Sequence, residues 1–191
     1  MMAARVSLMS FEASVEIGTS GEIFEDISNP CRESELSSSY NKMRTTMWPK
    51  CLKEIEKKTK ASRENTVDKN EEKEKLKRMI EEVFTQASND MMEKKRALQS
   101  FFEISDGTVV CRKCFEMAVQ SLQLMIFWKD CTRYQDISPD YLCEIADQCY
   151  KQGCLMALHN PPLTLDWDNR DNTCPFPPIT RKSMHKNMTD D

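Results

Sequence analysis

Apolar positions are most concentrated between Val109 and Cys131, the longest stretch of the chain in which they dominate. At about 100° per residue, a helix here gathers one group on a single face: Cys111, Cys114, Phe115, Ala118, Val119, Leu122, Met125 and Ile126. Its last turns carry aliphatic and aromatic residues on other sides as well, which predicts that this end is surrounded by protein. We therefore expect residues 109–132 to form the central core helix.

A second helical pattern precedes this run. Apolar residues recur every three or four positions from Leu76 to Phe102 and share one face, while Lys, Arg and Glu occupy the other face. This spacing predicts an amphipathic helix near 69–103. Lys94 and Lys95 interrupt the apolar face, so we expect a helix packed in a bundle more than a long, uninterrupted coiled coil.

A third helix is predicted near 139–159. Ser138 can cap it, Pro139 suits its first position, and Asp140 favours the positive end of the helix dipole. Asn160 and the two prolines after it end the helix.

Together these elements predict an all-α protein, a small antiparallel three-helix bundle over residues 69–160. Residues 1–68 are mostly polar and predict a disordered arm, with room for a short helix over 49–60 that begins at Pro49. An unbroken helix across that proline is not expected. Residues 161–191 are rich in proline and predict an extended or disordered tail.

Composition narrows the function. Only four of the 191 residues are glycine, and the chain has neither of the glycine-rich loops that hold nucleotide phosphates. We expect no enzymatic activity and no cofactor. Nine cysteines without an apolar signal segment predict reduced thiols in the cytoplasm or nucleus. Charged residues interrupt the run 109–131, which argues against a membrane span, and the net charge of −4 gives no general attraction to nucleic acid.

The one C-x-x-C motif, Cys111 and Cys114, is the sharpest chemical candidate. A structural zinc needs four ligands, and antiparallel second and third helices would bring Cys154 and His159 near this pair. Against that metal hypothesis, Cys111 and Cys114 fall on the apolar face of their helix, and Cys154 lies off the buried face of its own. Ordinary buried thiols are the favoured interpretation. A redox dithiol is a third, although no βαβ pattern accompanies the motif.

Candidate partner-binding residues lie outside the predicted bundle: Met47, Trp48, Leu52 and Trp167. Trp48 either anchors another protein or packs locally. Self-association through helix 69–103 is a further alternative. The basic segment 50–63 could meet an acidic partner or, weakly, nucleic acid, although a solvated basic face is the more frequent explanation.

We therefore expect a non-enzymatic protein–protein interaction module inside the cell, either an adaptor or a subunit of a larger assembly. The sequence does not identify its protein partner. The alternatives are a zinc-stabilised helical module and a weak nucleic-acid binder that uses residues 50–63.

Overall fold

The computed structural model of the chain describes residues 26–61, 69–101, 109–169 and 174–181, and helices dominate within them. The first described segments form one continuous rod, made of α2 (Glu33–Lys42), the π-helical turn η2 (Met43–Met47) and α3 (Trp48–Ala61). The helices after this rod are α4 (Lys69–Phe101), α5 (Val109–Trp128) and α6 (Asp140–Leu158). The expected all-α class is confirmed.

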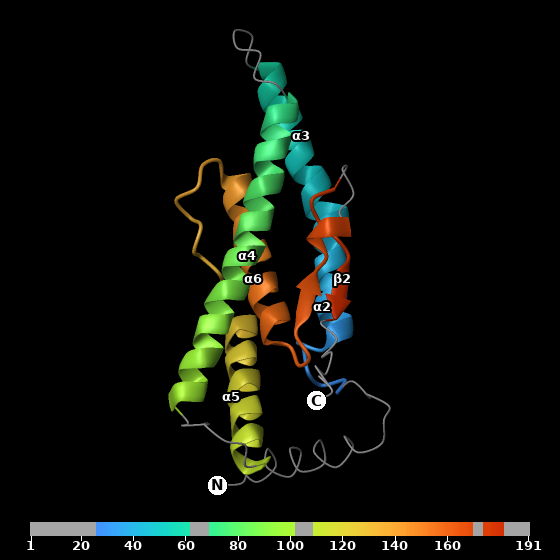
Figure 1. Ribbon diagram of the computed structural model, residues 1–191. Helices are drawn as coiled ribbons and strands as arrows, with labels where there is room; N and C mark the ends of the chain where they lie inside the picture. Colours follow the sequence, from blue (N-terminus) through green and yellow to red (C-terminus); the bar gives the residue numbers. More distant parts are fainter. Residues whose placement is uncertain (1–25, 62–68, 102–108, 170–173, 182–191) are drawn as a thin grey trace, which may run out of the picture.

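Successive helices run in opposite directions (Figure 1). The rod of α2 and α3 packs beside α4 and α6, and α5 lies beside the C-terminal half of α4. As a result α4 and α6 are parallel: Asp90 of α4 lies level with Tyr150 of α6, and Lys95 lies level with Ala157. Within the described residues the bundle therefore has four helical rods, one more than the sequence predicts.

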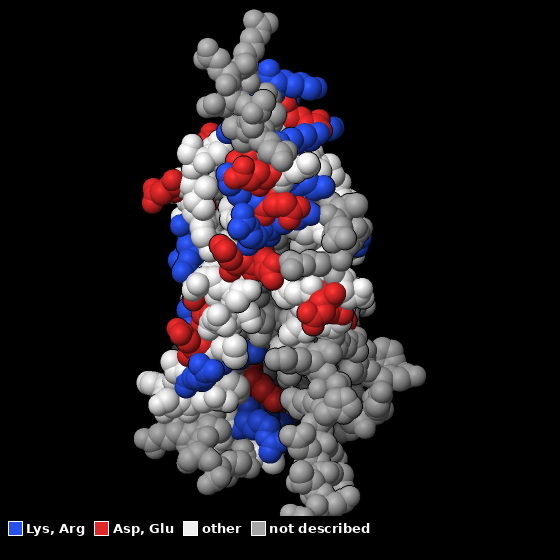
Figure 2. Space-filling view, turned by 45° about the horizontal axis from the view of Figure 1, so that its top comes forward, with Lys and Arg blue, Asp and Glu red and all other residues white. Residues whose placement is uncertain are grey.

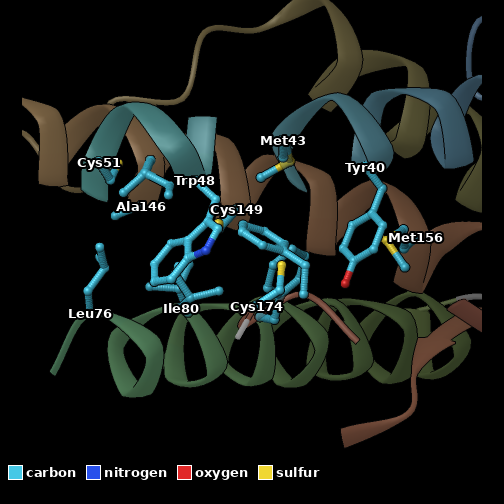
Figure 3. Close-up of a cluster of buried hydrophobic side chains, with 14 of the residues drawn as sticks. Tyr40, Met43, Trp48, Cys51, Leu76, Ile80, Ala146, Cys149, Met156 and Cys174 are labelled. Carbon is cyan, nitrogen blue, oxygen red and sulfur yellow. The ribbon is translucent and has the colours of Figure 1, made fainter. Parts of the chain in front are cut away.

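The additional rod corrects the prediction of a disordered arm over residues 33–61, and its last part contains the short helix predicted over 49–60. From Glu33 to Ala61 the chain is helical, whereas residues 1–25 and 62–68 lie outside the described part. The rod buries one stripe of side chains against α4 and α6: Leu36, Tyr40, Met43, Trp48, Cys51 and Ile55. In Figure 3, Tyr40, Met43, Trp48 and Cys51 point from the rod towards side chains of the other helices. Burial of this stripe stabilises a helix whose surface is otherwise polar.

Pro49 does not end the rod, because a π-helical turn lies directly before it. In a regular α-helix the proline ring would press against the carbonyl four residues earlier and would leave it without a donor. Here the N–H of Trp48 bonds the carbonyl of Met43, five residues earlier, so the turn is wider. The same turn explains why the buried stripe steps by five positions from Met43 to Trp48 and by three or four elsewhere.

The central helix is α6. Ten of its nineteen residues are buried, whereas α5 buries only Val119 and Gln123. The expectation that residues 109–132 form the central core helix is therefore wrong, although α5 spans nearly that range. No described helix combines the length and the apolar content that crossing a membrane requires.

The chain after α6 covers one side of the bundle. Strand β1 (Leu163–Leu165) pairs antiparallel with β2 (Ile179–Arg181), and the short helix η3 (Trp167–Asn169) comes after β1. Phe176, just before β2, is buried, and its ring lies edge-on to Tyr40 at 5.7 Å between centroids. The Tyr40 hydroxyl also donates a hydrogen bond to the Pro177 carbonyl, at 2.7 Å. In these described parts of the proline-rich tail, only the strands β1 and β2 are regular extended elements, and Phe176 contributes to the core.

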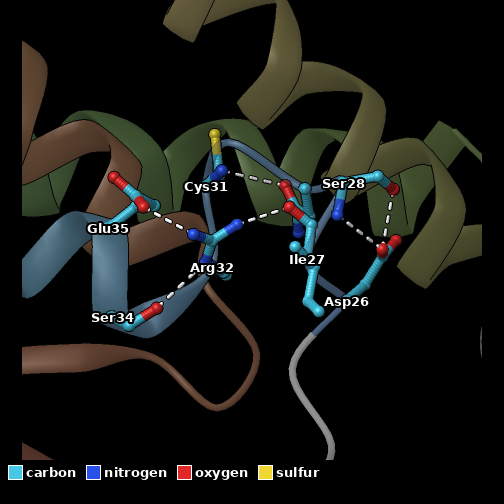
Figure 4. Close-up of polar contacts among 8 residues, drawn as sticks. Asp26, Ile27, Ser28, Cys31, Arg32, Ser34 and Glu35 are labelled. Atoms are coloured by element: carbon cyan, nitrogen blue, oxygen red, sulfur yellow. Dashed lines mark hydrogen bonds and ion pairs between the residues drawn. The ribbon is translucent and has the colours of Figure 1, made fainter.

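A network of short polar contacts organises the chain before α2 (Figure 4). Asp26 accepts hydrogen bonds from the backbone N–H and the hydroxyl of Ser28, at 2.9 and 2.6 Å. Arg32 contacts the Ile27 carbonyl and forms an ion pair with Glu35 at 2.6 Å. The described chain thus starts in a fixed turn, which lies near Phe127 of α5.

The helices α4 and α6 approach each other closely at Gly153. A Cβ placed on this residue would lie 2.8 Å from the Cβ of Ala87 and 3.1 Å from Cδ1 of Phe84. A separation of 2.8 Å is not tolerated between carbon atoms, and one of 3.1 Å would require the Phe84 ring to shift, so glycine is what allows the two helices to approach here.

We expect Gly153→Ala to lower the free energy of unfolding by about 1–3 kcal/mol, the usual cost of overpacking a core. Helix propensity alone predicts the opposite sign, since alanine is favoured over glycine by about 1 kcal/mol. Urea unfolding followed by circular dichroism measures the change. The double variant with Ala87→Gly should recover part of the loss. A single variant as stable as the wild type would contradict the close approach.

Buried thiols are a feature of this interior. The buried cysteines are Cys31, Cys51, Cys149, Cys154 and Cys174. Burial raises the pKa of Cys31 and Cys51 to about 11 and the pKa of Cys154 to about 12. It raises the pKa of Cys149 as well. The cause is the lost hydration of the thiolate, so these four groups stay protonated at neutral pH.

The free energy of unfolding should therefore fall as the pH rises above 9. In the unfolded chain these thiols lose their protons near pH 9, whereas Cys51 in the folded chain keeps its proton up to about pH 11. One such thiol contributes a slope of up to about 1.4 kcal/mol per pH unit. Urea unfolding at several pH values should give a shallower decline for Cys51→Ser, which lacks the titrating thiol. Parallel declines would contradict this assignment.

Candidate partner-binding surface

One side of α5 is fixed to the bundle. Val119 and Gln123 are buried, and Phe115, Leu122 and Ile126 pack half-buried against α4 and α6. The Gln123 amide donates a hydrogen bond to the Leu155 carbonyl at 2.8 Å. This side therefore sets the orientation of α5, and its other side faces outward.

The outward side carries an apolar and small-residue row that we call the α5 stripe: Val110, Cys114, Met117, Ser121, Leu124 and Trp128. Its members are separated by four, three, four, three and four positions, so they follow one face of the helix. Val110 is 69% exposed, Met117 42% and Trp128 77%, and the neighbouring Met125 is 69% exposed. Leu124 lies at the edge of this side, where it is half-buried and packs partly against the core of its own chain. The stripe contains no charged residue.

Trp128 is held at the end of the stripe by its neighbour. The rings of Phe127 and Trp128 meet edge to face, with centroids 5.0 Å apart. Phe127 packs partly against the core, and the ammonium of Lys151 lies 6.0 Å from the centroid of its ring. An indole that is fixed in direction but exposed to water is a suitable anchor for another protein.

The structure does not assemble the predicted metal ligands. Cys111 and Cys114 are exposed on α5, which corrects the prediction that they lie on its packed face. Cys154 is 1% exposed, which corrects its assignment to an unburied face of α6. Nδ1 of His159 lies 2.7 Å from the Pro161 carbonyl oxygen. In the described ranges, no three His, Cys, Asp or Glu side chains form a group that could hold a metal ion.

The predicted partner-binding residues belong to the core or its edge. Trp48 is only 4% exposed and packs between α3, α4 and α6, so local packing accounts for it. Met47 and Leu52 pack half-buried against the same cluster. Trp167 does so too, with its ring 6.3 Å from that of Phe84. Sequence reasoning missed α5 as the exposed surface, although the strict spacing of its outward row was visible.

A cleft of about 600 Å³ lies between α4, α5 and the C-terminal end of α6. The Lys95 ammonium in this cleft donates to the Ala157 carbonyl at 2.7 Å, and burial lowers the pKa of Lys95. Both Lys95 and Gln123 thus cap carbonyls in the last turn of α6, which have no partner within the helix. These side chains join the three helices.

The loop between α5 and α6 is held by two carboxylates. Asp90 accepts hydrogen bonds from Arg133 at 2.9 Å and from the Tyr150 hydroxyl. Asp147, which is buried, accepts the Tyr134 N–H at 3.0 Å. Hydrogen bonding of this kind satisfies the carboxylates and fixes the loop, so both have a structural role.

The basic segment 50–63 is neutralised in part by neighbouring acids. Lys50 pairs with Glu144 at 2.8 Å and Lys57 with Glu54 at 2.6 Å, and both pairs are at the surface. Figure 2 shows basic and acidic side chains interspersed over the upper part of the visible face. Residues 62 and 63 lie outside the described part. Such mixed charge gives little net attraction for phosphates, and nucleic-acid binding stays an untested alternative.

The apolar face of α4 is used within the chain. Leu76, Ile80 and Phe84 pack against the rod and α6, while Ala87 and Met91 pack against α5 and α6. Self-association through helix 69–103 would have to use the remaining faces of α4.

Comparisons of the chain with protein-family models, with curated protein sequences and with solved structures find no match.

Alkylation should separate the two groups of thiols. With iodoacetamide near pH 8, Cys111 and Cys114 should react first because they are exposed, and Cys149 and Cys154 should react at least about 100-fold more slowly. Peptide mass mapping at successive times measures each rate, and urea-unfolded protein is the control. Similar alkylation rates for the two groups would contradict the burial of Cys149 and Cys154. Protection of Cys111 and Cys114 by equimolar zinc would support the zinc hypothesis.

Proposed function

We propose that this protein is a non-enzymatic interaction module, which binds a helix of another polypeptide chain along the α5 stripe. The observation that carries the proposal is the exposed row of uncharged residues on a helix whose opposite side is fixed to the bundle. Contiguous exposed apolar surface of this kind is disfavoured in water and commonly marks an interaction site.

The residue types in the stripe suit protein binding. Tryptophan and methionine are enriched at interfaces, where they bury much area, and methionine adapts its shape to a partner. Trp128 and Met117, together with Met125 beside the stripe, supply this chemistry. Residue types that disfavour burial, such as lysine and glutamate, are absent from the stripe itself.

The spacing of the stripe favours a helix as the bound element. Alternating steps of three and four positions are the spacing with which two helices interlock side chains. From Val110 to Trp128 the row spans about 27 Å, at 1.5 Å per residue, which is five turns of contact for a partner helix. An amphipathic helix with its apolar face towards α5 would fit this surface.

The experiment compares which proteins three baits capture from a lysate of cells that naturally produce this protein. The baits are the wild type, Met117→Glu and the control Gln148→Glu, which adds the same charge at an exposed position on α6. We expect at least one stoichiometric protein that the wild type and the control retain and Met117→Glu loses by about tenfold or more, because the new carboxylate would lose its hydration on binding. Quantitative mass spectrometry measures the retention. Equal retention by all three baits would contradict the proposal.

A further inference from the structure

The α5 stripe is complementary to itself when one copy is reversed. Consider a second α5 that runs antiparallel to the first, with residue 119 of both copies at the same level. Three pairs of residues then face each other across the contact: Val110 and Trp128, Cys114 and Leu124, and Met117 and Ser121. The chain then places a smaller residue against a larger one in every pair. Core layers that combine small and large side chains fill space evenly.

A parallel arrangement lacks this match. It pairs each residue with its own copy, so Trp128 meets Trp128 at one end and Ser121 meets Ser121 near the middle. One layer would be overfilled and another would leave a void, and both defects cost stability. The reversed register is therefore the favoured one.

The positions that flank the stripe also permit the reversed register. On one side Ala118 meets Ala118 of the second copy, and Cys111 meets Met125. On the other side Gln120 meets Gln120, and Lys113 lies opposite Phe127, whose ring packs partly against the core of its own chain. No two like charges face each other in this arrangement, and the alanine pair lets the helices approach closely.

We infer that the helix bound by the α5 stripe is α5 of a second copy of this chain, packed antiparallel about a two-fold axis. This inference rests on the proposed function and names its occupant. An isologous contact of this kind closes after two copies, so it gives a dimer and no open filament.

The size of the contact sets the expected strength. A helix of 20 residues is about 30 Å long, and one helix pair lies at the small end of specific interfaces. We therefore expect a dimer that dissociates in the micromolar range and re-forms as the concentration rises.

Sedimentation of the full chain at several concentrations tests the inference. The wild type and the control Gln148→Glu should show the same monomer–dimer equilibrium. Met117→Glu alone and Ser121→Lys alone should each dimerise at least about tenfold more weakly, because each places a charge in the apolar contact without a partner. Circular dichroism checks that both variants remain folded.

Mixing these two single variants tests the register. In the antiparallel register the new carboxylate of one copy lies against the new ammonium of the other, so the mixture should dimerise more strongly than either variant alone. In the parallel register each variant alone sets two like charges against each other, so mixing would relieve that repulsion without pairing opposite charges. Met117→Glu would then bind Ser121→Lys no more strongly than it binds the wild type. A mixture of the two variants that dimerises no more strongly than Met117→Glu mixed with the wild type would overturn the antiparallel arrangement.

Radical footprinting at the same concentrations separates other occupants. A second copy predicts that oxidation of Met117 and Trp128 falls as the concentration rises. Constant protection in a monomer would overturn the inference and point to residues 1–25, which precede the turn beside α5. A wild-type protein that stays monomeric at every concentration, with Met117 and Trp128 both open to oxidation, would also overturn the inference. The proposed function would then still stand if Met117→Glu alone loses a captured protein.

Discussion

The close approach of α4 and α6 is the constraint on which the rest of the structure depends. These two parallel helices meet at Gly153 of α6, which has no side chain to keep it apart from Ala87 and Phe84 of α4. Because parallel neighbours cannot follow each other directly in the chain, another element must return between them, and α5 does so. The rod of α2 and α3 and the chain after α6 cover one flank of the α4–α6 pair. On the other flank, α5 covers only the C-terminal part of these two helices. This unequal cover leaves one side of α5 in water.

Much of the helical content could be predicted from the sequence. Strong periodicity located α4, and the prolines at 139, 161 and 162 located α6 within a residue or two. The predicted cap at Ser138 is wrong, because Pro139 is the N-cap residue and no side chain caps the helix. Of the rod from Glu33 to Ala61, only the short helix over 49–60 was predicted, and the rest was missed for a physical reason. Its buried stripe contains a step of five, so a search at a fixed period of 3.6 loses the pattern at the same place where Pro49 also argues against a helix.

The role of α5 could not be derived from its apolar content. A helix that is apolar on several sides is buried in a core or covered by another chain, and composition does not distinguish these outcomes. The decision depends on how far α4 and α6 can surround it, which is a property of the tertiary arrangement. The same uncertainty reversed the expected burial of three thiols: Cys111 and Cys114 face outward, and Cys154 faces the core. Residue types in the stripe could be recognised beforehand, but their exposure could not.

The π-helical turn has a consequence for how the length of the chain can vary. It is equivalent to a single residue inserted into a regular α-helix, since Leu36, Tyr40 and Met43 before it share a face with Trp48, Cys51 and Ile55 after it. Deleting one residue from Met43–Met47 would leave both halves of the stripe in register, whereas a deletion elsewhere in the rod would rotate its later residues against its earlier ones by about 100°. The shortened helix would, however, press the ring of Pro49 against a carbonyl of the preceding turn. Loss of a residue at this turn and replacement of Pro49 are therefore coupled changes.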